Sequence, residues 1–156
     1  MNDIDFSQEF NEDCSKIELQ ALRDRVWVCL FSNDIIYFHQ VTKPTVFSAN
    51  LMYERCKELE KEINGPVAYL IDLRETSKIP SLKLRNIYSS HTNTKPDYVY
   101  HISVFLNESF MLDVIKFILR TFSLEGFSIH TSQEEAIAII DLKRNQHNNK
   151  LNKTSK

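Results

Sequence analysis

Glycine is nearly absent from this sequence, with only Gly65 and Gly126 among 156 residues. Loops that hold a phosphate group through close approach of the backbone depend on glycine, because a side chain would block that approach. Neither a GxGxxG nor a GxxxxGK[ST] motif can be written in this chain. The nucleotide-binding classes that rely on those two loops are therefore excluded.

Cysteine is also scarce, and its pattern excludes two further classes. Cys14, Cys29 and Cys56 are odd in number, far apart and without a CxxC pair, which fits neither a disulfide framework nor a zinc site. The five histidines have no HxH or HxxxH spacing. We therefore expect free thiols in a reducing cytoplasm, no bound metal and no cofactor.

Motifs for nucleophilic catalysis are missing as well. No serine stands in a GxSxG elbow, and Cys29 lies in the middle of an apolar run, where a thiol is inert. Asp72 and Arg74 alone do not make a set of acid, base and oxyanion donors. We expect the protein not to be an enzyme.

The sequence has no long apolar run. The longest such stretch, residues 111–122, is interrupted by three charged residues and is shorter than the roughly 20 residues that a membrane-spanning helix needs. The first residues are acidic and lack the features of a signal peptide. We expect a cytoplasmic protein without a membrane span.

The chain has the composition of one globular domain with charged ends. It is 42% hydrophobic and 26% charged, which suffices for a single core. We expect an acidic tail at 1–15, an α/β domain at 16–142 and a basic, disordered tail at 143–156, because that last segment has one aliphatic residue. It would be a nucleic-acid or anionic-lipid arm or a solvated tail. The second interpretation is preferred, so nucleic acid is not an expected partner.

Hydrophobic periodicity predicts strands that alternate with helices. Residues 16–40 are strand-like, and residues 67–71 form an apolar run typical of a strand buried on both faces of a parallel sheet. The expected order is βββ-α-β-α-β-α-β-α. This order predicts an α/β domain with a mostly parallel central sheet and antiparallel N-terminal strands. The later elements are expected at about 45–64 (helix), 67–71 (strand), 80–91 (helix), 98–106 (strand), 108–122 (helix), 127–130 (strand) and from 133 (helix).

Two segments carry a resemblance to a known family. Residues 65–74, Gly-Pro-Val-Ala-Tyr-Leu-Ile-Asp-Leu-Arg, and residues 127–136, Phe-Ser-Ile-His-Thr-Ser-Gln-Glu-Glu-Ala, resemble the ends of corresponding elements in STAS-like domains. That superfamily includes the sporulation anti-sigma-factor antagonists and an uncharacterised bacterial group, also labelled CRAL-TRIO-like. The resemblance covers residues 16–142. It implies a STAS-like fold and a non-enzymatic regulatory module that binds a protein partner in bacterial cytoplasmic signalling.

One motif of the antagonists is not retained. Their Asp-Ser-Ser-Gly loop has a second serine that accepts phosphate, and the corresponding stretch here is Pro80-Ser81-Leu82-Lys83. The phosphate-accepting position is therefore Leu82. The resemblance does not bring the usual phosphorylation switch to this chain, although Ser77 and Ser81 are possible phosphorylation sites.

The first candidate binding site follows the apolar strand at residues 67–71. Its polar side chains lie at the carboxyl end of the predicted parallel sheet, where α/β proteins bind ligands. Such a cluster would bind a partner loop or an anionic group. Alternatively, these side chains cap local backbone and pair with one another. The candidate residues are Asp72, Arg74, Ser77, Lys78, Ser81 and Arg85.

The second candidate surface is the helix at 108–122, which carries more apolar residues than one sheet face needs. Phe110, Met111 and Phe117 would form a partner or homodimer interface, or line a pocket for an apolar small ligand. The alternative is that they simply belong to the core. The alternative function is therefore a STAS- or CRAL-TRIO-like carrier of a lipid or other small molecule.

Overall fold

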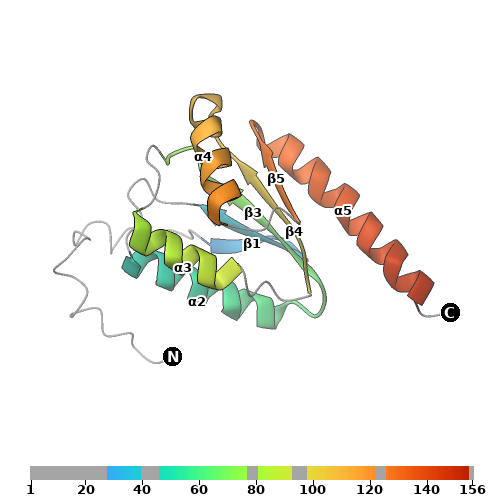
Figure 1. Cartoon of the computed structure of the whole chain (residues 1–156). Helices are drawn as coiled ribbons and strands as arrows, with labels where there is room; N and C mark the ends of the chain where they lie inside the picture. The colour runs from blue at the N-terminus through green and yellow to red at the C-terminus, as the bar shows by residue number, and fades with distance from the viewer. Residues whose placement is uncertain (1–27, 40–45, 77–80, 93–97, 122–125, 155–156) are drawn as a thin grey trace.

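The computed structural model describes residues 28–39, 46–76, 81–92, 98–121 and 126–154. These residues form five strands and four helices, whose α/β arrangement can be followed in Figure 1. In chain order the elements are β1 (Val28–Ser32), β2 (Ile35–His39), α2 (Val46–Glu62), β3 (Val67–Asp72), α3 (Leu82–Thr92), β4 (Val99–Phe105), α4 (Glu108–Thr121), β5 (Phe127–His130) and α5 (Gln133–Thr154).

The strands form one sheet in the order β1-β2-β3-β4-β5. β1 and β2 pair in antiparallel fashion, and every later pair is parallel. This confirms the mostly parallel sheet with an antiparallel N-terminal pair. The predicted acidic tail at 1–15 and the first of the three expected N-terminal strands lie outside the described residues.

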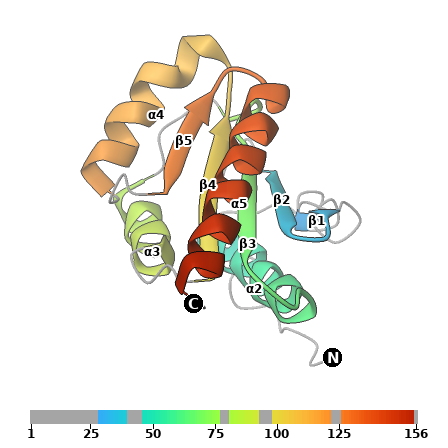
Figure 2. The same cartoon turned by 90° about the vertical axis from the view of Figure 1, so that its right-hand side faces the viewer.

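Helices cover both faces of this sheet (Figures 1 and 2). α2, α3 and α4 lie on one face, where buried Met52 of α2 and Val114 of α4 belong to two core clusters. α5 lies on the opposite face, where Ala136 and Ile140 pack with residues of β2, β3 and β4. The reversal occurs after β5, since the chain leaves β2, β3 and β4 toward one face and leaves β5 toward the other.

β3 is the central strand, as its apolar sequence predicts. Val67, Ala68 and Leu70 are fully buried, because side chains alternate between two faces that are both covered. Ala68 and Leu70 face α5, while Val67 packs on the α4 side. Asp72, at the end of the strand, continues the alternation on the α5 face and is also completely buried.

The basic C-terminal segment differs from the sequence prediction. Residues 143–154 are not disordered, since α5 continues to Thr154. Ile140, Arg144 and His147 follow one another on the side of this helix that faces the sheet. The guanidinium of Arg144 bonds Asp34. The ring of His147 stacks on that of Tyr100, with 5.8 Å between the ring centroids. A segment with one aliphatic residue is therefore ordered by polar and aromatic contacts with the sheet.

No helix within the described ranges is both long and apolar enough to cross a membrane.

Candidate functional site

A row of four side chains crosses the sheet where its parallel strands end. The register pairs His39 of β2 with Asp72 of β3, Asp72 with Phe105 of β4, and Phe105 with His130 of β5. Paired residues of neighbouring strands project to the same face, and Phe105 packs on the α5 side. The carboxyl edge of the sheet therefore places two imidazoles, one carboxylate and one aromatic ring side by side.

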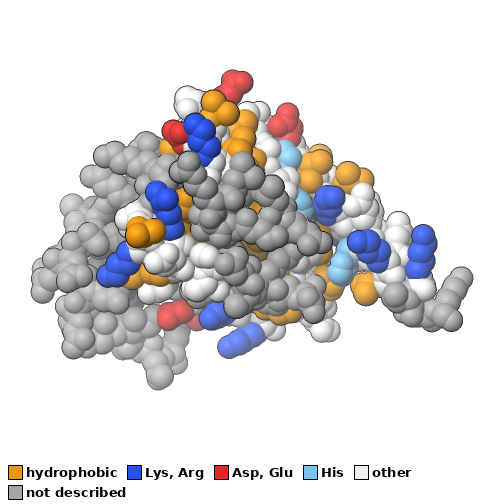
Figure 3. All heavy atoms as spheres, in the orientation of Figure 1, with side chains coloured by type: hydrophobic (Ala, Val, Ile, Leu, Met, Phe, Trp, Pro, Cys, Tyr) orange, Lys and Arg blue, Asp and Glu red, His pale blue; other side chains and the backbone are white. Residues whose placement is uncertain are grey.

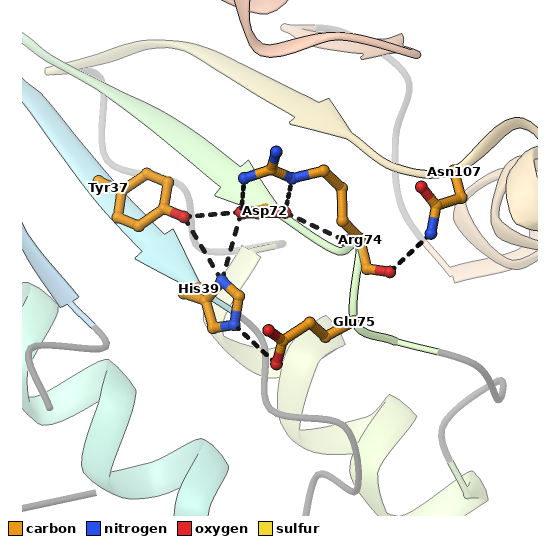
Figure 4. Close-up of polar contacts among 6 residues, drawn as sticks. All are labelled: Tyr37, His39, Asp72, Arg74, Glu75 and Asn107. Carbon is orange, nitrogen blue, oxygen red and sulfur yellow. Dashed lines mark hydrogen bonds and ion pairs between the residues drawn. The ribbon is translucent and has the colours of Figure 1, made fainter.

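The centre of this row is an ion pair between Asp72 and Arg74 (Figure 4). Arg74 donates from Nε to Asp72 Oδ1 at 3.0 Å and from Nη2 to Oδ2 at 2.7 Å. The backbone N–H of Arg74 also donates to Oδ1, at 3.0 Å. Bidentate contacts of this kind fix the guanidinium plane as well as contributing energy.

Two side chains of β2 complete the surroundings of the carboxylate. Tyr37 donates its hydroxyl to Asp72 Oδ2 at 2.7 Å, and His39 Nδ1 lies 3.3 Å from the same oxygen. The other ring nitrogen of His39 lies 3.3 Å from an oxygen of Glu75, just beyond β3 (Figure 4). The Asp72 carboxylate is thus surrounded by donors from β2 and from the turn that follows β3.

These donors determine the charge of Asp72. Burial disfavours the carboxylate, but the hydrogen bonds from Arg74 and Tyr37 outweigh burial and lower the pKa of Asp72 to about 2. The group is an anion at neutral pH and cannot act as a proton donor there. Within the described part of the chain, no three His, Cys, Asp or Glu side chains are placed to hold a metal ion.

Arg74 differs from Asp72 in being accessible. Its side chain is 51% exposed, whereas that of Asp72 is 1% exposed. The guanidinium carbon lies 4.9 Å from the centre of the Phe105 ring, and Asn107 Nδ2 donates to the Arg74 carbonyl at 2.8 Å. In Figure 4 the remaining guanidinium nitrogen points away from the carboxylate. The site therefore presents one immobilised cation to solvent.

The other predicted members of this site are placed differently. Ser81 caps α3, since its hydroxyl accepts a hydrogen bond from the N–H of Leu84 at 3.4 Å. The guanidinium of Arg85 lies over the ring of Phe117, 5.7 Å from its centre, and so links α3 to α4. Ser77 and Lys78 lie outside the described residues.

The predicted apolar surface of α4 is largely directed inward. Phe110, Met111 and Phe117 are partly buried and pack against the core cluster that contains Val114. Among the side chains of this helix that the structure describes, up to residue 117, the exposed large apolar one is instead Leu112, which is 70% exposed. The core interpretation of the three predicted residues therefore fits their packing best.

A second polar cluster lies between β4, β5 and α5. Ser128 Oγ is 2.8 Å from His101 Nε2, from His130 Nε2 and from Ser103 Oγ. Ser103 donates its proton to the Ala136 carbonyl at 3.0 Å, so Ser128 donates to Ser103 and accepts an N–H from each imidazole. This arrangement joins α5 to the sheet and leaves Ser128 without a hydrogen-bonded base, which it would need to be a nucleophile.

Sequence reasoning identified Asp72 and Arg74 but missed Tyr37, His39, Glu75 and Asn107. Tyr37 and His39 stand two apart in a predicted strand, so a shared face was foreseeable. Their position beside Asp72 depends on the register between β2 and β3, which cannot be read from the sequence.

In comparisons with known proteins, no family model, no curated protein and no solved structure matches this chain.

Proposed function

We propose that this chain is a non-enzymatic, STAS-like regulatory module that binds a protein partner through the carboxyl edge of its sheet. The observation that carries this proposal is the half-exposed Arg74, held in place by a buried Asp72. A guanidinium whose inner edge is already bonded keeps its outer N–H groups for a carboxylate of the partner. Because Asp72 and Phe105 immobilise the side chain beforehand, little conformational entropy is lost on binding.

Binding is favoured over catalysis by the chemistry of the same groups. The carboxylate of Asp72 accepts three hydrogen bonds from Arg74 and one from Tyr37. A general base or acid needs a pKa near the working pH, and that of Asp72 is about 2. A fixed ion pair of this kind positions a recognition residue rather than moving protons.

The test compares two double variants in affinity capture from the source cells, followed by titration with the purified captured protein. Asp72→Asn/Arg74→Gln removes both charges of the site and keeps hydrogen-bonding groups. Arg55→Gln/Glu58→Gln removes an exposed ion pair of α2 and is the matched control. We expect the control to bind like the wild type and the site variant to bind at least about tenfold more weakly, the equivalent of one lost charged hydrogen bond.

Equal binding by both variants would rule out this surface. Native mass spectrometry of the purified protein adds a second criterion, since a co-purified small molecule that leaves on denaturation would favour a carrier of small ligands and overturn the proposal. Circular dichroism of each variant verifies that a loss of binding is not a loss of fold.

A further inference from the structure

The far half of α5 is a basic helix at the opposite end of the sheet from Arg74. Residues 142–154 contain Lys143, Arg144, Lys150 and Lys153 and no acidic residue, in a chain with a formal net charge of -2. Arg144 is engaged with Asp34 beside the start of β2. In Figure 3 the side chains along this half of α5 are blue, pale blue, orange or white, without red.

The three lysines lie on one side of the helix. Lys143 and Lys150 are seven residues apart, about two turns, and Lys153 follows about one turn later. The whole set spans about 15 Å along the axis, because each residue adds about 1.5 Å. Phosphates of a nucleic-acid strand follow one another at about 3.4 Å along a duplex, so several phosphates fit within this length.

Amide side chains occupy most of the remaining exposed surface. They are all solvent-exposed and can both donate and accept hydrogen bonds, as sugars and base edges require. The amides are Asn145, Gln146, Asn148, Asn149 and Asn152. By helical spacing Gln146 and Asn149 lie on the same side as the three lysines, and the other three amides lie on the opposite side. A nucleic acid offers phosphates to the lysines and also sugars and base edges to the amides. An acidic protein would need the lysines alone, so a surface with both groups and no carboxylates matches a nucleic acid better.

The positions of the two leucines make an anionic membrane a poorer partner for this half of α5 than a nucleic acid. A helix that lies on a membrane needs an apolar face. Leu142 and Leu151 are each 49% exposed, but they are nine residues apart, about two and a half turns, and project on opposite sides. This half of α5 therefore has a charged and amide-rich side but no continuous apolar side.

We propose that the lysine and amide side of α5, residues 143–153, binds the phosphate backbone of a nucleic acid without sequence preference. The sequence-based expectation against nucleic acid assumed a disordered tail, and a helix instead holds the three lysines in a fixed array. The proposal is independent of the Arg74 surface, because it uses different residues at the other end of the sheet.

The experiment measures fluorescence anisotropy of a short labelled RNA strand and of a DNA duplex as the full chain is added. We expect a Kd on the order of 10⁻⁴ M, the weak end of non-specific binding, and for the duplex a loss of affinity with salt that corresponds to about three phosphate contacts. Lys143→Gln/Lys150→Gln/Lys153→Gln should bind at least about tenfold more weakly. The control Lys57→Gln/Lys61→Gln/Lys83→Gln has the same change in net charge on α2 and α3 and should bind like the wild type.

A second variant, Gln146→Glu/Asn149→Asp, places negative charges on the lysine side of the helix, where Gln146 accepts a hydrogen bond from Lys143 at 3.4 Å, and should also weaken binding if this side faces phosphate. Equal losses in both lysine variants would overturn the proposal, because binding would then follow net charge alone. The same conclusion follows if neither nucleic acid binds, if phosphatidylserine vesicles bind and nucleic acid does not, or if polyglutamate competes as well as RNA of equal charge. Circular dichroism confirms that α5 is intact in every variant.

Discussion

Arg144 of α5 bonds Asp34, which lies in the turn between β1 and β2 and 110 residues earlier in the chain. Its Nε donates to Asp34 Oδ2 at 2.5 Å and its Nη2 donates to Oδ1 at 2.9 Å. Tyr100 donates to Oδ2 of the same carboxylate at 3.0 Å. This contact holds the C-terminal half of the last helix against the beginning of the sheet.

Removing this contact should loosen α5 more than it disturbs the rest of the fold. Arg144→Gln should lower the free energy of unfolding by about 1–2 kcal/mol, since it removes a charged, bidentate hydrogen bond that is partly screened by solvent. Urea unfolding measures the loss, and hydrogen exchange should show faster exchange of α5 amides beyond Ile140. Arg55→Gln, which breaks an exposed pair with Glu58, should change stability by less than about 0.5 kcal/mol. An equal effect of the two substitutions would contradict this account.

Leu70 tests the central position of β3. Leu70→Ala should lower the free energy of unfolding by about 2–5 kcal/mol, because the side chain is fully buried between β3 and α5 and its removal leaves a cavity. Chemical denaturation measures this cost. Leu112→Ala, at a site that is 70% exposed, should cost less than about 0.5 kcal/mol. If Leu70→Ala were equally mild, β3 would not be the buried centre of the sheet.

The ion pair of Asp72 should make the stability of the protein fall at acidic pH. The pKa of this carboxyl is about 2 in the folded chain, against an ordinary value of 3.8, so the unfolded chain takes up a proton that the folded chain does not. Between about pH 4 and pH 2 the free energy of unfolding should therefore fall by about 2 kcal/mol from this group.

Urea titrations across that pH range measure the loss for the wild type and for Asp72→Asn. The variant should be less stable at neutral pH and should show a smaller decrease on acidification, because it has no carboxyl to protonate at this position. Parallel pH profiles for the two proteins would show that Asp72 is not the group responsible.

His130 should make the stability of the protein depend on pH in a second range, closer to neutral pH than that of Asp72. Burial lowers the pKa of its imidazole, and the carboxylate of Glu135 opposes this effect only partly. The unfolded chain therefore binds a proton more tightly than the folded chain does. Stability from His130 is complete above the ordinary pKa of about 6.5 and is lost as the pH falls through the lower pKa of the folded state.

Thermal unfolding at several pH values between about 7 and 5 measures this effect. His130→Gln, which can still donate to Ser128, should remove part of the pH dependence while leaving the strand pairing of β4 and β5 intact. A variant that loses stability on acidification as steeply as the wild type would exclude His130 as its source.

Much of the fold was predictable because its signals are local. The apolar run at 67–71 indicated a strand buried on both sides, and the hydrophobic periodicity at about 45–64 indicated the helix that the structure places at Val46–Glu62. The error at residues 143–154 has a physical cause. The composition of a segment indicates how much apolar surface it can bury. It does not indicate that Arg144 will bond Asp34 or that His147 will stack on Tyr100, and these contacts hold the segment on the sheet.

The candidate site was predictable only in part, for a related reason. Asp72 and Arg74 are two residues apart, so the sequence alone indicates that they share a side of the chain. The contacts of Tyr37 and His39 with Asp72 exist because β2 pairs with β3 in one particular parallel register. A different register would have put other side chains beside the carboxylate.

By itself, the sequence determined most elements of this protein, because the spacing of apolar residues within a short window selects strand or helix. It also indicated that Asp72 and Arg74 lie on one side of the chain. It did not determine that α5 continues to Thr154. Only the tertiary structure decided which distant residues meet, including His39 with Asp72 and Arg144 with Asp34. These partners are brought together by strand register and by the packing of α5 on the sheet, which arise from contacts summed over the whole chain rather than from any one segment.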